Sequence, residues 1–167
     1  MIRRARADDV GFLVALYGDP DVRPYLAASA DFSPAAVAAE VERSTQEPEA
    51  FGRFVIEVDG EPAGAIGFER SNVRSAIARC GGLAIDPRFR GRRLADDAAR
   101  EFIRHLILDV GFHRLEMEVY GFNHRSAAHA ERAGWVREGV KRSAYRHGDG
   151  WVDGILYAVV REDLEDG

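Results

Sequence analysis

The sequence predicts a single α/β domain over residues 1–167, built on a mixed β-sheet. The length suits one domain, and apolar residues make up 46% of the chain, which is enough for a substantial core. Strand and helix patterns follow one another in the order β, α, α, β, β, β, α, β, α, β, β. A strand–helix–strand unit around residues 82–119 indicates at least one parallel pair of strands.

Composition argues against several classes of protein. The net charge of −5 argues against general nucleic-acid binding, which needs a broad basic surface. No apolar run approaches the roughly 20 residues of a membrane-spanning helix, so we expect no membrane association. The N-terminal MIRRARADDV lacks the apolar stretch of a signal peptide, so we expect a cytoplasmic protein. The single cysteine, Cys80, excludes an internal disulfide and a cysteine-based zinc site.

The first elements are a short strand and two helices. Residues 1–6 fit a strand. Asp8 is predicted to be the N-cap of a helix that ends near Gly18. Ser33 and Pro34 indicate the start of a second helix, with serine as N-cap and proline at the first helical position.

A run of strands follows. Residues 54–58 and 63–68, joined by Asp59-Gly60, predict a hairpin. Ser71-Asn72 is predicted as a second turn, and residues 76–85 as a longer strand.

The second half predicts two helices and three strands. A wide apolar stripe indicates a helix over residues 94–110, and alternation indicates a strand over 115–120. Asn123 can cap a helix that runs to Ala133 and is closed by Gly134. The two last strands are predicted at 135–145 and 151–160, joined by residues 147–150.

An arginine-rich turn lies between the strand at 76–85 and the helix at 94–110. Its four arginines are Arg88, Arg90, Arg92 and Arg93. A helix start with exposed N–H groups and a glycine binds anions well, and arginine adds bidentate hydrogen bonds to phosphate. The turn therefore predicts a phosphate-bearing ligand held between Arg90 and Ala95. The alternative is a solvated turn that is salt-bridged to Asp96, Asp97 or Glu101. Neither the P-loop motif nor the dinucleotide fingerprint G-x-G-x-x-G occurs.

Three segments resemble the GNAT N-acetyltransferases. Residues 85–87, Ile-Asp-Pro, precede residues 90–95, which are similar to the acyl-CoA-binding motif Q/R-x-x-G-x-G/A, with Arg93 where the family usually has glycine. Residues 123–135 resemble the family's N-x-x-S/A...E-K-x-G-F segment. Residues 150–157 resemble the closing strand of the branch that acetylates ribosomal-protein N-terminal alanine. The resemblance covers nearly the whole chain.

The resemblance implies a fold and a cosubstrate. The two central strands, 80–86 and 115–121, would splay apart within a sheet that has helices on both faces. Acetyl-CoA would bind in this gap without a metal. The implied cofactor-binding residues are Leu83, Ile85, Arg90, Gly91, Arg92, Arg93, Leu94, Ala95, Asn123 and Ser126.

The transfer reaction requires a neutral amine and a donor for the oxyanion. Glu116 and Glu118 share one face of a central strand, so either is a candidate general base acting through water, unless both simply line a solvated, salt-bridged face. The usual catalytic tyrosine of the family is replaced by Ala130. Ser126 matches the serine that the N-terminal-acetylating branch is proposed to use instead, although it could only cap its helix.

Several other residues are expected to be structural. His124 and His129 are spaced i, i+5, which does not favour a shared metal ion. Cys80 is expected to pack as a small buried hydrophobe. Trp135 and Trp151 are expected in the core or in a pocket wall.

Tyr145 and His147 are weaker candidates for the acceptor side of the site. Arg132 is expected to be solvated rather than bound to the adenosine 3′-phosphate.

The acceptor and the assembly stay open. An N-acetyltransferase is the leading hypothesis. Its acceptor would be a protein N-terminus or a small amine such as a polyamine, an antibiotic or an amino acid analogue. A non-catalytic acyl-CoA sensor and a nucleotide- or nucleic-acid-binding module are the alternatives. The chain is expected to be a monomer or a homodimer.

Overall fold

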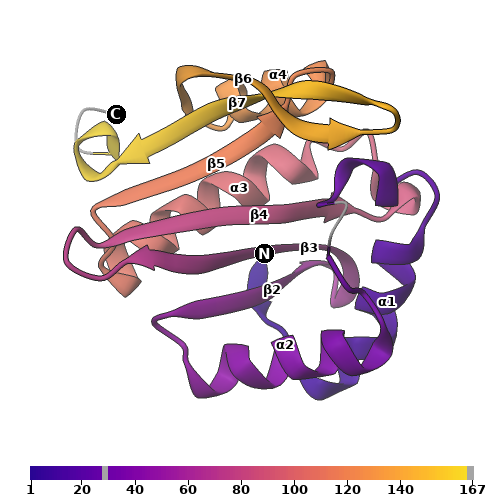
Figure 1. Cartoon of the computed structure of the whole chain (residues 1–167). Coiled ribbons are helices and arrows are strands. Elements are labelled where there is room, and N and C mark those ends of the chain that lie inside the picture. Colours follow the sequence, from indigo (N-terminus) through magenta and orange to yellow (C-terminus); the bar gives the residue numbers. More distant parts are fainter. Residues whose placement is uncertain (28–29, 165–167) are drawn as a thin grey trace.

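A mixed sheet of seven strands carries four α-helices in the computed structural model, which describes residues 1–27 and 30–164 (Figure 1). The strands are β1 (Ile2–Arg4), β2 (Phe51–Val58), β3 (Glu61–Asn72), β4 (Ile77–Ile85), β5 (Arg114–Tyr120), β6 (Val136–His147) and β7 (Gly150–Val160). The helices are α1 (Val10–Gly18), α2 (Pro34–Gln46), α3 (Leu94–Arg104) and α4 (His124–Arg132). The strand order is β1-β2-β3-β4-β5-β7-β6, and β4–β5 is the parallel pair. The predicted fold class and element order are therefore confirmed.

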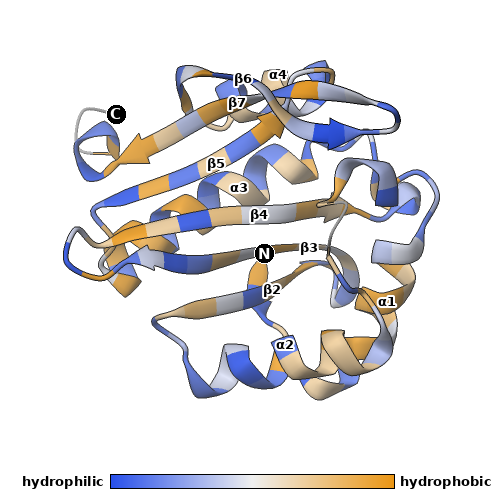
Figure 2. Cartoon of the chain, viewed as in Figure 1, coloured by the Kyte–Doolittle hydropathy of each residue, from blue (hydrophilic) through white to orange (hydrophobic). Residues whose placement is uncertain are grey.

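The sheet separates two hydrophobic cores, because successive strand residues point to opposite faces. Phe54 and Ile56 of β2 face α3 and α4, whereas Val55 between them faces α1 and α2. Phe102 and Leu106 fill the first core and are fully buried. Figure 2 shows mostly hydrophilic residues along β6, which forms an exposed edge of the sheet.

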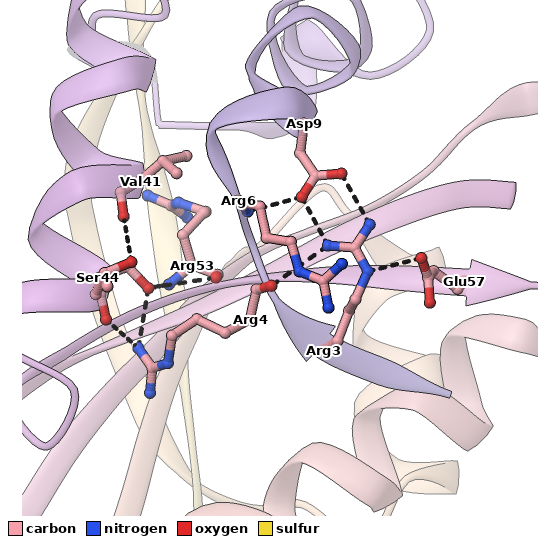
Figure 3. A network of polar contacts seen from close by, with 9 residues as sticks. Arg3, Arg4, Arg6, Asp9, Val41, Ser44, Arg53 and Glu57 are labelled. Atoms are coloured by element: carbon pink, nitrogen blue, oxygen red, sulfur yellow. Dashed lines mark hydrogen bonds and ion pairs between the residues drawn. The ribbon is translucent and has the colours of Figure 1, made fainter. Parts of the chain in front are cut away.

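Asp9, not the predicted Asp8, organises the start of the first helical segment (Figure 3). A 3₁₀ turn (Ala7–Asp9) precedes α1, and the buried Asp9 carboxylate accepts the backbone N–H of Arg6 at 2.7 Å. Its two oxygens also accept the Arg3 guanidinium at 2.7 and 2.9 Å, and Arg3 Nε donates to Glu57 at 2.6 Å. Asp8 is exposed. The ion pair of Asp9 with Arg3 of β1, which also pairs with Glu57 of β2, therefore selects Asp9.

The predicted hairpin is confirmed, but the second turn was placed too early. Asp59 and Gly60 adopt the positive φ angles of 51° and 81° that a tight two-residue hairpin favours. Ser71 and Asn72 instead extend β3, and the chain reverses over residues 73–76. The Asn72 side chain accepts the N–H of Ser75 at 2.8 Å, so this asparagine supports the turn from the end of the strand.

The predicted helix boundaries hold where a local cap sets them. Ser33 Oγ accepts the N–H of Ala36, Asn123 Oδ1 accepts the N–H of Ser126 at 3.1 Å, and Gly134 closes α4 with φ 98°. The helix predicted over 94–110 begins at Leu94, but its last six residues form a π-helical segment (His105–Val110).

The sheet opens along its centre, between the two parallel strands. Only Ile77–Arg79 of β4 pair with Arg114–Glu116 of β5, so the ladder stops before Cys80. A bulge in β4 at Gly82, where φ is 67°, follows the point of separation. The expected splay of the central strands is therefore present, and it positions the candidate site.

Candidate functional site

A cavity of about 510 Å³ lies where β4 and β5 separate. Four of the residues predicted for the site line it together: Leu83 from β4, Glu118 from β5, and Asn123 and Ser126 from the start of α4. Cys80, His129, Trp135 and Tyr145 also contribute to its wall. Because the ladder is broken here, backbone groups of β4 beyond Arg79 have no partner in β5.

The arginine-rich turn lies beyond the carboxyl end of β4 and does not line the cavity. Gly91 has φ 82°, and Arg93 is the N-cap of α3 in the left-handed region, with φ 55° and ψ 14°. The N–H groups of Leu94 and Ala95 lie in the first turn, where a helix supplies no acceptor of its own, and the side chain of Arg93 makes no capping hydrogen bond. The turn thus presents the donors that an anion would need.

The four arginines of this turn differ in their surroundings. Arg88 is held by Asp86 at 2.9 Å and by Glu61 at 3.2 Å, and Arg90 lies 3.7 Å from Asp21. Arg92 and Arg93 are exposed and have no hydrogen-bond or ion-pair partner for their side chains within residues 1–27 and 30–164. Two guanidinium groups are therefore free to contact a polyanion.

The expected alternative partners of the turn are engaged elsewhere. Asp96 is buried at the start of α3, where Oδ2 accepts Arg132 Nε at 2.9 Å and Oδ1 lies 2.5 Å from His129 Nδ1. The Arg132 guanidinium, together with His129, lowers the pKa of Asp96 to about 2 despite burial. Asp97 pairs with Arg100. The salt-bridged reading of the arginine turn is therefore wrong for Asp96 and Asp97.

Glu118 is the glutamate that reaches the cavity. Its Oε1 accepts Lys141 Nζ at 2.5 Å, and its Oε2 accepts the hydroxyl of Tyr145. Burial raises the pKa of Glu118, but the hydrogen bonds from Lys141 and Tyr145 outweigh burial, so the pKa lies below its usual range. The carboxylate is therefore ionised at neutral pH and is a weak base.

Glu116 is held away from the cavity. Its carboxylate accepts Arg114 Nε at 2.7 Å, and Arg114 also pairs with Glu138 of β6 at 2.5 Å. Glu116 is not part of the cavity wall. For this residue the structure agrees with the salt-bridged strand face that was the alternative to catalysis.

Ile85 also lies outside the cavity wall. It pairs with Gly64 near the end of β4 and packs against the hydrophobic core that faces α3 and α4. Of the two β4 residues assigned to the cofactor, only Leu83 lines the cavity.

His129 is the residue that sequence reasoning missed. It lies one turn after Ser126, lines the cavity, and is oriented by Asp96, which is 33 positions earlier in the chain. Arg132, which was expected to be solvated, holds the other oxygen of Asp96. The i, i+3 spacing of Ser126 and His129 puts them on one face of α4, but the contact between α3 and α4 could not be predicted from either segment alone.

The structure agrees with some of the remaining predictions for the cysteine and the aromatic residues and differs from others. Cys80 is buried in the core, where burial strongly raises the pKa of its thiol. Trp135 is 6% exposed and lines the cavity, as expected, but Trp151 is 64% exposed, so its placement in the core was wrong. Tyr145 reaches the cavity, while His147 packs on Phe122 with ring centroids 4.5 Å apart.

The described residues include no cluster of three or more side chains able to hold a metal ion, and no helix long and apolar enough to cross a membrane.

Comparison with known proteins gives one family model. Residues 1–136 match the model described as an acetyltransferase (GNAT) domain. Over 83 residues the chain is 28% identical to the SPbeta prophage-derived uncharacterized N-acetyltransferase YokL of Bacillus subtilis (strain 168). That alignment covers 50% of this chain and 47% of the relative, so the chain matches less than half of that protein.

Solved structures that share the fold over nearly the whole chain include two acetyltransferases from Vibrio species. The spermidine N-acetyltransferase of Vibrio cholerae in complex with CoA and spermine has a TM-score of 0.87 and 16% identity, covering 99% of this chain and 97% of the other. The ribosomal-protein-S5-alanine acetyltransferase of Vibrio fischeri has a TM-score of 0.83 and 17% identity, covering 97% and 93%.

Proposed function

Because the chain belongs to the GNAT acetyltransferase family, we propose that it transfers an acetyl group from acetyl-CoA directly to a primary amine. The observation that carries this proposal is the break between β4 and β5, with Glu118 on one wall of the resulting cavity and Leu83 on the other. Acetyl-CoA is a cosubstrate here, and no step needs a metal ion.

The two ends of acetyl-CoA would use two different features. The pantetheine arm would run through the cavity beside Leu83 and Asn123, pairing with backbone groups of β4 as far as Ile85. The pyrophosphate would then sit on residues 90–95, where first-turn N–H groups and exposed arginines meet.

The chemistry follows from the groups on the cavity wall. Glu118 would accept the amine proton through a water molecule, and an unpaired N–H of β4 would stabilise the oxyanion. The thiolate leaves without strong assistance because a thiol pKa is about 8.5, and Ser126 is the proposed proton donor. Cys80 is protonated at neutral pH, which disfavours a covalent acyl-cysteine intermediate and supports direct transfer.

The weak basicity of Glu118 favours an α-amine as the acceptor. A protein N-terminus has a pKa of about 7.7–8.0, so much of it is already neutral near pH 7.5, whereas an aliphatic amine such as a lysine side chain has a pKa of about 10.4. A glutamate with a lowered pKa assists the first kind of acceptor more effectively than the second. We therefore propose a protein N-terminal α-amine, and a polyamine is the competing acceptor.

Ligand-dependent thermal unfolding tests the cofactor assignment. Acetyl-CoA at 100 times its dissociation constant should add about 2.7 kcal/mol to the free energy of unfolding and raise Tm. CoA should act similarly, because it carries the same pantetheine and phosphates, and ATP should act weakly. Equal shifts with all three ligands would identify a general polyanion patch, and no shift with any would contradict the assignment.

Thiol release in the presence of candidate amines tests the reaction. We expect faster release with a peptide that begins with a free alanine than with spermidine, and none above background with the same peptide blocked at its N-terminus. Faster release with spermidine would reverse the proposed acceptor order. Binding of acetyl-CoA with no turnover of any amine would favour a non-catalytic acyl-CoA sensor, the alternative that Ala130 in place of the usual tyrosine suggests.

A further inference from the structure

Lys141 is the single lysine among the 23 lysine and arginine residues of the chain. It lies on β6, and its Nζ is 2.5 Å from Oε1 of Glu118, the carboxylate that lines the cavity. The Lys141 side chain is 48% exposed, whereas that of Glu118 is 17% exposed. A half-exposed primary ammonium group is thus held against a mostly buried carboxylate of the cavity wall.

The contact depends on the local shape of the sheet. Gly154 of β7 lies between β5 and β6, where a Cβ would come within 2.6 Å of Tyr145 Cε2 and 3.2 Å of Glu118 Oε2. The missing side chain lets Tyr145 cross β7 and reach Glu118. A register shift between Lys141 and Tyr145, with Ser143 at φ 51°, breaks the regular course of β6 at this point.

We propose that Lys141 is a resident ammonium group that the acceptor's ammonium group replaces on Glu118. This inference rests on the proposed function and identifies how the acceptor is recognised. Both groups are primary ammonium ions, so they suit the same carboxylate oxygen. Lys141 is the exchangeable partner because a half-exposed ion pair of a flexible side chain contributes little. The part-buried Tyr145 hydroxyl keeps the other oxygen in place.

The ion pair with Lys141 also lowers the basicity of Glu118. The groups that act on this carboxylate are Lys141, Tyr145 and, at longer range, Arg79. When the ammonium group of Lys141 is removed, a contribution that lowers the pKa of Glu118 is lost and the effect of burial remains. Loss of Lys141 should therefore favour acceptor binding and make Glu118 a stronger base.

Steady-state kinetics of Lys141→Met test the exchange. With the alanine peptide we expect KM to fall roughly two- to fivefold, and the acidic limb of the kcat/KM profile to move to higher pH. Lys141→Arg should keep KM close to that of the wild type. The matched control is Arg142→Met, which removes a neighbouring exposed charge of the same strand that does not contact Glu118. An unchanged or raised KM in Lys141→Met would overturn the inference.

Selective isotope labelling of lysine tests the exchange without any turnover. The label gives one side-chain resonance, because the sequence holds one lysine. With CoA bound, titration with the alanine peptide should move this resonance to the position of a free lysine. Glu118→Gln should show that position already without peptide. A resonance that stays still while the peptide binds would refute displacement. Absence of turnover in the wild type would instead count against the proposed function.

Discussion

Gly154 is a single residue on which the geometry of the acceptor side depends. A methyl group at this position would collide with the Tyr145 ring at 2.6 Å. We expect Gly154→Ala to destabilise the protein by about 1–3 kcal/mol, as overpacking does, and to separate Tyr145 from Glu118. Because the hydrogen bond to Glu118 is the main cause that raises the pKa of Tyr145, that pKa should fall in an ultraviolet titration.

Gly139→Ala provides the matched control for Gly154→Ala. Gly139 lies on the neighbouring strand β6, which also carries Tyr145, and nothing lies within 4 Å of an added Cβ. Gly139→Ala should leave both the free energy of unfolding and the titration of Tyr145 nearly unchanged. If both variants behave alike, the close approach at Gly154 does not determine the position of Tyr145.

Asp96 gives the stability of the protein a defined dependence on pH. Its folded-state pKa of about 2 lies below the ordinary value, so its ionised form stabilises the fold. This contribution is complete above about pH 4 and disappears as the pH falls through about 2. Asp96→Asn should therefore lower the free energy of unfolding by roughly 1–2 kcal/mol at pH 7. Urea unfolding of both proteins at pH 7 and pH 3 should show the difference shrinking, and a constant difference would contradict the assignment.

At the scale of elements, the backbone at the start of α3 accounts for the glycine that the family motif usually has at position 93. Arg93 stands where the resembling motif has glycine, and its φ of 55° lies in the left-handed region that glycine adopts without strain. The structure thus gives a backbone reason for the usual glycine.

Arg93→Gly should separate the backbone effect from the side-chain effect at this position. Relief of the left-handed strain should stabilise the free protein by up to about 1 kcal/mol, after the entropic cost of glycine. Loss of the guanidinium should weaken acetyl-CoA binding if it contacts a phosphate. Thermal unfolding with and without acetyl-CoA measures both. A less stable free protein would contradict the strain argument.

The elements that the sequence predicted well are those fixed by local chemistry. Serine and asparagine caps, the Asp59-Gly60 turn and the closing Gly134 act within a few residues, so their patterns are visible in the chain. The choice of Asp9 over Asp8, the pairing of Asp96 with His129 and the exposure of Trp151 depend on how strands and helices pack together. That packing arises only in the folded chain, so one sequence could not reveal it.

At the scale of the whole molecule, the sheet consists of two ladders joined by three paired residues of β4 and β5. The core with α3 and α4 continues across this join on one face of the sheet. We expect acetyl-CoA to slow hydrogen exchange in residues 80–85 of β4, which do not pair with β5. Residues 77–79, which do pair with β5, should be unaffected. Exchange measured by mass spectrometry with and without ligand tests this. Uniform protection of the whole chain would indicate global stabilisation rather than binding along β4.

The near absence of lysine has a further chemical consequence. Among the lysine and arginine side chains, all except Lys141 are arginines, whose guanidinium groups stay protonated and do not attack thioesters at neutral pH. A protein that works beside a reactive thioester is exposed to stray acylation of its own amines. Here the side chains offer one such amine, and without a bound acceptor Glu118 holds that amine in its unreactive ammonium form. The composition therefore protects the surface charge of the protein against slow chemical damage by its own cosubstrate.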